Sequence, residues 1–115
     1  MRVIWGLAGV AALAGAFVLA GADAWQTWVF LFFADVGLLA GIAPGLQKGQ
    51  LHPRAVPLYN ALHLPIGPLL LGLISLAFGI EWFAGALAWT AHIAIDRAAG
   101  YRLRDHDGFI RSSGW

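Results

Sequence analysis

The stretch VIWGLAGVAALAGAFVLAGA, residues 3–22, is twenty residues long and contains no charged side chain. An α-helix of this length extends about 30 Å, which matches the hydrocarbon core of a bilayer. The whole chain agrees, because 60% of its 115 residues are hydrophobic, only 11% are charged, and the mean hydropathy is +0.73. A soluble domain is roughly 45–50% apolar and about 25% charged. We therefore expect an integral membrane protein.

Three more segments are apolar enough to span a bilayer, namely residues 25–43, 57–79 and, approximately, 81–100. Together with residues 3–22 they predict a single all-α domain of four transmembrane helices, followed by a tail at residues 101–115. Short connections place consecutive helices antiparallel, so an up-down-up-down bundle is the simplest topology. Pro65 and Pro68 each remove a backbone donor, and they predict a kink in the third span just beyond His63.

The basic residues predict the orientation of the bundle, because cytoplasmic loops are enriched in Lys and Arg. They lie before the first span, between the second and third spans, and at or after the end of the fourth: Arg2, Lys48, Arg54, Arg97, Arg102, Arg104 and Arg111. With four spans these regions share one side, so both termini are expected in the cytoplasm. We expect Arg102, Arg104 and Arg111 to meet anionic lipid headgroups.

An alternative interpretation of the N-terminus is a signal peptide, since Arg2 and the apolar run precede ADA at residues 22–24. The run of about twenty apolar residues is longer than a typical signal-peptide core, which favours a transmembrane helix. The first span also carries small residues at four-residue spacing, from Ala8 to Ala20. Such a face allows close helix approach and makes a homo-oligomer a reasonable expectation.

Five polar residues within the expected spans need an explanation, because polar groups in a membrane usually face the interior and pair. They are Asp35, Asn60, His63, His92 and Asp96. At about 1.5 Å per residue, His63, His92 and Asp35 lie about 9–13 Å from the cytoplasmic ends of their spans, and Asn60 and Asp96 about 5–6 Å. Three helices are thus expected to bring polar groups to one layer near the cytoplasmic leaflet.

Two imidazoles and two carboxylates at one level suit a divalent metal ion such as zinc, iron or manganese. We expect Asp35, His63, His92 and Asp96 to be its ligands, with Asp96 as either a ligand or a catalytic general base. A bound ion of this kind lowers the pKa of its water, so the site would be hydrolase-like. Two alternatives stay open: a polar layer that only holds helices or a partner together, and a haem or ion-handling site.

Composition excludes other classes of function. The net charge of +1 leaves no basic surface typical of nucleic-acid binding, and the lipid bilayer is the expected partner. The chain has no cysteine, which excludes disulfides, thiolate metal sites and cysteine nucleophiles.

The residues YNALH (59–63), HIAIDRAAGYRLR (92–104) and GF (108–109) resemble the domain of unknown function 4260 family, a group of small bacterial integral membrane proteins. The resemblance covers most of the chain after residue 25, and the C-terminal motif is its specific part. The matching positions are Asp35, Tyr59, Asn60, His63, His92, Asp96, Arg97, Gly100 and Tyr101. Arg102 and Arg104 stand where the family pattern has Gly and Lys.

The resemblance implies a multi-pass protein of the bacterial inner membrane, and it gives weight to the polar set without naming a reaction. Helical spacing places Asn60 on the face of His63 and Tyr59 beside it, and Arg97 and Tyr101 are expected to face the headgroup of a lipid-like substrate, so these four residues are expected to support the site. A weaker likeness to membrane-bound metal-dependent hydrolases rests on an early Asp, a middle His and a late HxxxD, which is analogy only.

Overall fold

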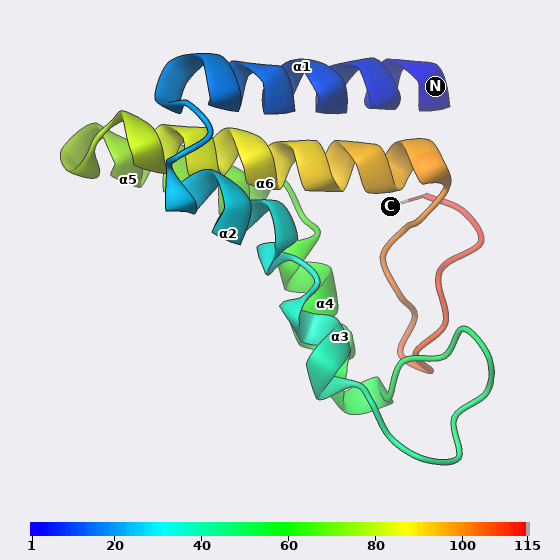
Figure 1. Cartoon of the computed structure of the whole chain (residues 1–115). Helices are drawn as coiled ribbons and strands as arrows, with labels where there is room; N and C mark the ends of the chain where they lie inside the picture. Colours follow the sequence, from blue (N-terminus) through cyan, green and yellow to red (C-terminus); the bar gives the residue numbers. More distant parts are fainter. Residues whose placement is uncertain (115) are drawn as a thin grey trace.

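The computed structural model describes residues 1–114 as helices followed by an irregular tail (Figure 1). The helices are α1 (Arg2–Ala20), α2 (Trp25–Phe33), α3 (Val36–Ala40), the 3-10 turn η1 (Pro53–Ala55), α4 (Val56–Leu62), α5 (Ile66–Phe78) and α6 (Ile80–Ala99). Within residues 1–114, β structure is restricted to one isolated bridge between Arg104 and Ile110. The expected all-α class is confirmed.

Helices α1 and α6 lie along each other and run in opposite directions (Figure 1). Small residues allow their close approach, although the face in use is Gly9 and Ala16 rather than the complete Ala8–Ala20 row. A Cβ placed on Gly9 would lie 2.7 Å from Ile95 Cγ1 and 3.3 Å from the Ala91 carbonyl oxygen. Part of the small-residue face of α1 is therefore used in the contact with α6.

Helix α2 also packs against α6, in which Ala84 and Ala88 are completely buried, and His92 Nδ1 donates to the Leu31 carbonyl of α2. Gly85 also faces α2, since a Cβ at that position would lie 2.7 Å from the Phe30 ring. The sequence predicts that these small residues bring a neighbour close to the face that carries His92 and Asp96. The packing of α2 confirms that prediction.

Two of the expected spans are each divided into two helices. The segment 25–43 breaks between α2 and α3, with Asp35 immediately before α3. The segment 57–79 breaks between α4 and α5, and the η1–α4 and α5 axes differ by 49°. This second break follows His63 and confirms the predicted kink. The break at Asp35 was not predicted, because the sequence has no proline near it.

Partners outside α4 and α5 stabilise the break beyond His63. Pro65 and Pro68 lie at the start of α5, where backbone N–H groups have no acceptor within the helix, so the missing proline N–H breaks no helical hydrogen bond. The Leu62 carbonyl, at the end of α4, accepts a hydrogen bond of 2.9 Å from Trp89 Nε1 on α6. Gly67 leaves room for the same indole, because its Cβ would lie 2.5 Å from that ring.

The tail after α6 folds back onto the loop between α3 and η1, beside α3 and α4 (Figure 1). The Leu51 amide donates to the Gly108 carbonyl at 3.0 Å. Asn60 on α4 pairs with the backbone of Arg104 in both directions, through Nδ2 to the carbonyl at 3.0 Å and from the amide to Oδ1 at 2.8 Å. The tail is thus a docked part of the fold.

By length and hydropathy, α1 is the one helix in the described part of the chain that can cross a membrane on its own. The bent pair Pro53–Leu62 and Ile66–Phe78 would be a second if it forms one span. Arg2 Nε donates to the Ala98 carbonyl at 2.7 Å, so the start of α1 and the end of α6 lie together. The four-span topology and its orientation remain predictions.

Candidate functional site

Four side chains from three separate parts of the chain converge at the two helix breaks. Asp35 lies between α2 and α3, His63 ends α4, and His92 and Asp96 are one turn apart on α6. One ligand atom from each lies within 4.8 Å of all the others. We call this group the Asp35–His63–His92–Asp96 cluster.

Nitrogens and oxygens alternate around the cluster at nearly equal spacing. Asp96 Oδ2 lies 3.2 Å from the Nε2 atoms of both His63 and His92. Asp35 Oδ1 lies 3.2 Å from His92 Nε2 and 3.6 Å from His63 Nε2. Atoms bonded at about 2.0–2.1 Å to a tetrahedral zinc ion are about 3.4 Å apart, so the spacing suits one ion.

Backbone carbonyls fix the orientation of both imidazole rings. His63 Nδ1 donates to the Tyr59 carbonyl and His92 Nδ1 to the Leu31 carbonyl, each at 2.8 Å, because a carbonyl oxygen can only accept. In a neutral ring the lone pair then belongs to Nε2, which faces the carboxylates. Metal-ligating histidines typically bind a carbonyl or carboxylate through their other nitrogen in this way.

The two Nε2 atoms are buried and have no hydrogen-bond partner of acceptable geometry among the described residues. Ionised Asp35 and Asp96 offer only acceptors, so lone pairs face lone pairs across the cluster. Such an arrangement needs either protons on the rings or a cation between the four groups. The cluster therefore has the electrostatic character of a cation site.

The carboxylates of Asp35 and Asp96 differ in their exposure to solvent, so they are suited to different chemical roles. The Asp96 side chain is 26% exposed and equidistant from both rings, whereas that of Asp35 is 44% exposed and closer to His92. Asp96 is thus the better-enclosed carboxylate. Asp35 is the more accessible group to exchange with water or substrate.

A layer of aromatic and cationic groups supports His63 from the side of the tail. The buried Tyr59 ring stacks on His63 with 4.1 Å between centroids, and the Arg104 guanidinium lies 4.8 Å from the Tyr59 centroid. Arg104 is itself only 8% exposed and donates through Nη1 to the Gly49 and Gly108 carbonyls, at 3.0 and 2.7 Å. The expectation that Arg104 meets lipid headgroups is therefore wrong.

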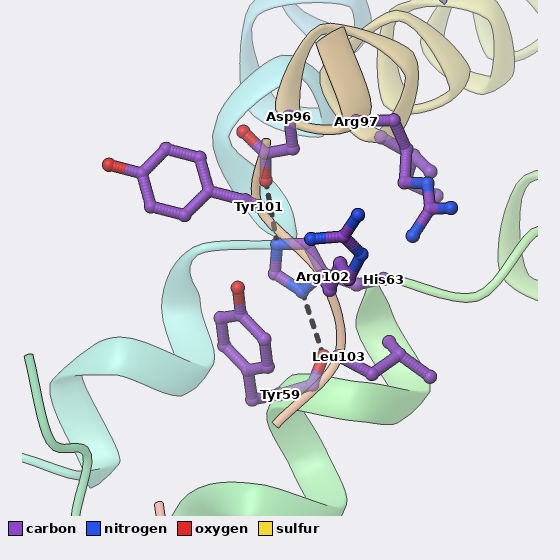
Figure 2. Close-up of a pocket in the computed structure, with 8 residues that line it drawn as sticks. Tyr59, His63, Asp96, Arg97, Tyr101, Arg102 and Leu103 are labelled. Carbon is purple, nitrogen blue, oxygen red and sulfur yellow. Dashed lines mark hydrogen bonds and ion pairs between the residues drawn. The ribbon is translucent and has the colours of Figure 1, made fainter. Parts of the chain in front are cut away.

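A small pocket opens beside the cluster, between α4, α6 and the tail (Figure 2). Its lining residues are Tyr59, His63, Ile93, Asp96, Arg97, Tyr101, Arg102 and Leu103. His63 and Asp96 both line this pocket, whose volume of about 10 Å³ is close to that needed for one water molecule. The pocket also places two arginines beside them.

The residues expected to support the site divide into two groups. Tyr59 contacts the cluster directly, while Arg97 and the half-exposed Tyr101 line the pocket beside it. Asn60 instead holds the Arg104 backbone. Sequence reasoning missed the contribution of Arg102 and Leu103 to the pocket, and the nearest signal was the departure at Arg102 from the family pattern.

The geometry also bears on the haem alternative. Two axial histidines must hold a porphyrin between their nitrogens. Here the oxygens of Asp35 and Asp96 occupy that space, at 3.2–3.6 Å from the Nε2 atoms. The arrangement favours a single ion over a haem.

Comparison with known proteins gives one match. The model of a family described as "Domain of unknown function (DUF4260)" matches residues 4–113, nearly the whole chain. No curated protein and no solved structure matches the chain.

Proposed function

This chain belongs to the DUF4260 family, and from the geometry of its cluster we propose that it is a membrane protein that binds one divalent metal ion for hydrolase-like chemistry. The observation that carries the proposal is the orientation of His63 and His92. Both Nδ1 atoms are bound to backbone carbonyls, and both Nε2 atoms point at the same two carboxylates.

Zinc is the ion that this ligand set suits best, and iron and manganese are the other candidates. In the proposed site His63, His92 and Asp96 hold the ion. A catalytic zinc site keeps three protein ligands and leaves one position for water or substrate. Asp35 borders that fourth position, and its exposure suits it to accept a proton from a bound water. Asp96 then acts as a ligand rather than as the general base.

The pocket beside the cluster supports a chemical role over a purely structural one. Four protein ligands can close a structural metal site, but here the Asp35 side chain is 44% exposed, and a small pocket lined by Arg97, Tyr101 and Arg102 lies beside the cluster. The metal would polarise a substrate oxygen and lower the pKa of its water. The arginines would hold an anionic substrate in place.

The second candidate function is a polar layer that only fixes helix packing. It requires protonated rings, with each imidazolium paired to Asp35 or Asp96. The short distances to both carboxylates are compatible with it. The two candidates differ in one measurable property, since the structural layer binds no metal.

The proposed setting is the bacterial inner membrane, with four passes and cytoplasmic termini. Two observations support it: the apolar length of α1, and the meeting of Arg2 with the end of α6. In this setting the divided segments 25–43 and 57–79 are broken spans. Discontinuous helices in membrane proteins often carry ligand-binding groups at their breaks. Asp35 and His63 lie at such breaks.

Metal analysis of the full-length protein, purified in a non-ionic detergent and reloaded with zinc, tests the proposal. We expect about one zinc per chain, and at least a hundredfold loss of affinity in His92→Ala and in Asp96→Asn. His106→Ala removes an exposed tail histidine outside the cluster and is the matched control. A folded wild-type protein that binds no divalent metal refutes the proposal, as does an equal loss in His106→Ala.

A further inference from the structure

A long apolar groove runs between α1 and α5 over the surface of α6. Its volume is about 830 Å³, which lies within the 300–1,000 Å³ typical of ligand pockets. Trp5 and Ala8 line one wall, residues 65–76 line the other, and α6 forms the floor from Phe83 to Ala94. Sixteen residues within these segments line the groove, and only Trp5 and Thr90 among them have a polar side-chain atom, so the groove suits a hydrocarbon chain.

One end of the groove lies close to the cluster. Ile93 lines both the groove and the pocket beside Asp96, and Pro65 lies two residues from His63. The floor from Phe83 to Ala94 extends about 16 Å along α6, at about 1.5 Å per residue. Half of a hydrocarbon core of about 30 Å is about 15 Å, so the groove has the length of one leaflet.

Arg97 and Arg102 line the pocket beside the cluster, and Arg97 also lies near the groove. Arg97 lies 5.7 Å from the ring centroid of Trp5, which lines the groove. Arg97 Nη1 and Arg102 Nε both donate to the Gly114 carbonyl, at 3.0 and 3.1 Å. Two guanidinium groups that converge on one oxygen form a geometry in which a multidentate anion binds more strongly than a neutral carbonyl.

We propose that the groove and the two arginines bind an amphiphile that has one alkyl chain and a phosphate-type headgroup. The chain lies in the groove, and the phosphate replaces the Gly114 carbonyl between Arg97 and Arg102. A phosphate has enough oxygens to engage both arginines and also face the ion at His63 and Asp96, whereas a carboxylate has only two. This inference rests on the proposed metal site, for which it names the substrate class.

Titration calorimetry on the zinc-loaded, full-length protein in a non-ionic detergent tests the inference with three probes. They are dodecyl phosphate, methyl phosphate and dodecyltrimethylammonium. We expect dodecyl phosphate to bind at least about tenfold more tightly than either of the others. Methyl phosphate binding as tightly as dodecyl phosphate would indicate a site for free phosphate rather than for a lipid headgroup. The cationic amphiphile binding as tightly as dodecyl phosphate would indicate that alkyl chains partition into the groove without recognition of the headgroup.

Two sets of variants separate the chain from the headgroup. A Cβ at Gly72 meets nothing within 4 Å, so Gly72→Leu fills the groove without a clash. Ala77→Leu adds the same side chain to an exposed position of α5 outside the groove and is its control. Arg97→Gln with Arg102→Gln removes the headgroup contacts, and Arg111→Gln removes a charge from the same tail outside the pocket.

In the expected result, Gly72→Leu loses the advantage of dodecyl over methyl phosphate, while Ala77→Leu keeps it. The double arginine variant loses the preference for the anionic amphiphile, while Arg111→Gln keeps it. Equal binding of the anionic and cationic amphiphiles by wild type, or equal affinities of Gly72→Leu and Ala77→Leu, overturns the inference. Zinc content is measured on every sample, so failure of this inference with full zinc occupancy is distinct from failure of the metal site.

Discussion

Asn60→Ala is the substitution whose effect can be worked out most directly from the structure. The Asn60 amide makes two hydrogen bonds to the backbone of Arg104, at 3.0 and 2.8 Å. These bonds join α4 to the tail, and Arg104 is only 8% exposed. The substitution removes both bonds and leaves a backbone amide and carbonyl in a largely enclosed position.

The expected magnitude follows from those two bonds. A hydrogen bond contributes about 1 kcal/mol net, and a buried group left without a partner costs about 1–3 kcal/mol. We therefore expect tail docking to weaken by about 2–3 kcal/mol, or about 30- to 150-fold in the equilibrium between docked and released tail. Asn60→Asp keeps the acceptor and loses the donor, so its effect should be intermediate.

Amide hydrogen exchange of residues 101–111, measured on full-length protein in detergent, reports this equilibrium. Exchange should accelerate about 30-fold or more in Asn60→Ala, while the protection of α1 and α6 stays unchanged. Gln50→Ala is the comparison, since it loses two exposed hydrogen bonds, one of 2.9 Å to the Asp107 carbonyl and one of 3.1 Å from the Gln47 amide. Tail protection in Asn60→Ala within about threefold of wild type, or equal to that in Gln50→Ala, would refute the reasoning.

Three further substitutions test the packing around the site, each by thermal unfolding in detergent. Gly108 has φ +95°, and a Cβ there would overlap the Leu51 carbonyl oxygen. Gly108→Ala should therefore destabilise the docked tail by at least about 2 kcal/mol. Tail amides that exchange hydrogen as slowly as in wild type would contradict this. Trp89→Phe loses the hydrogen bond at the α4–α5 break and should lower the free energy of unfolding by about 1–2 kcal/mol. Trp28→Phe loses an exposed hydrogen bond and should lower it by less than about 0.5 kcal/mol. Equal effects of the two variants would contradict the role of Trp89. Gly9→Val overpacks the α1–α6 contact and should lower the free energy of unfolding by about 1–3 kcal/mol. Ala14→Val, on the exposed face of α1, should change it little. Equal effects of the two variants would show that α1 does not contact α6 at Gly9.

The sequence predicted the features that depend on local chemistry. Apolar runs identified the helical class, and proline identified the break after His63. The spacing of His92 and Asp96 placed both on one face of α6, because residues four apart in a helix are neighbours. Depth along the expected spans was sufficient to group Asp35, His63 and His92 in one layer.

Other features depend on contacts between distant segments, and the sequence left them open. The break at Asp35 has no proline to mark it. Arg104 looked like a headgroup contact, yet it is buried because its donors meet the Gly49 and Gly108 carbonyls. Backbone partners of this kind cannot be read from side-chain identity, since every residue offers the same carbonyl.

The sequence by itself thus determined that the chain is helical, where one helix kinks, and that Asp35, His63, His92 and Asp96 are candidates for one polar group, although it also placed Asn60 in that layer. The tertiary structure alone decided their distances, the orientation of the two imidazoles, and the placement of a small polar pocket and an apolar groove that share Ile93 in their linings. The physical reason is that hydropathy and helical spacing act along the chain. Ring orientation and cavity shape arise from packing between α2, α4, α6 and the tail.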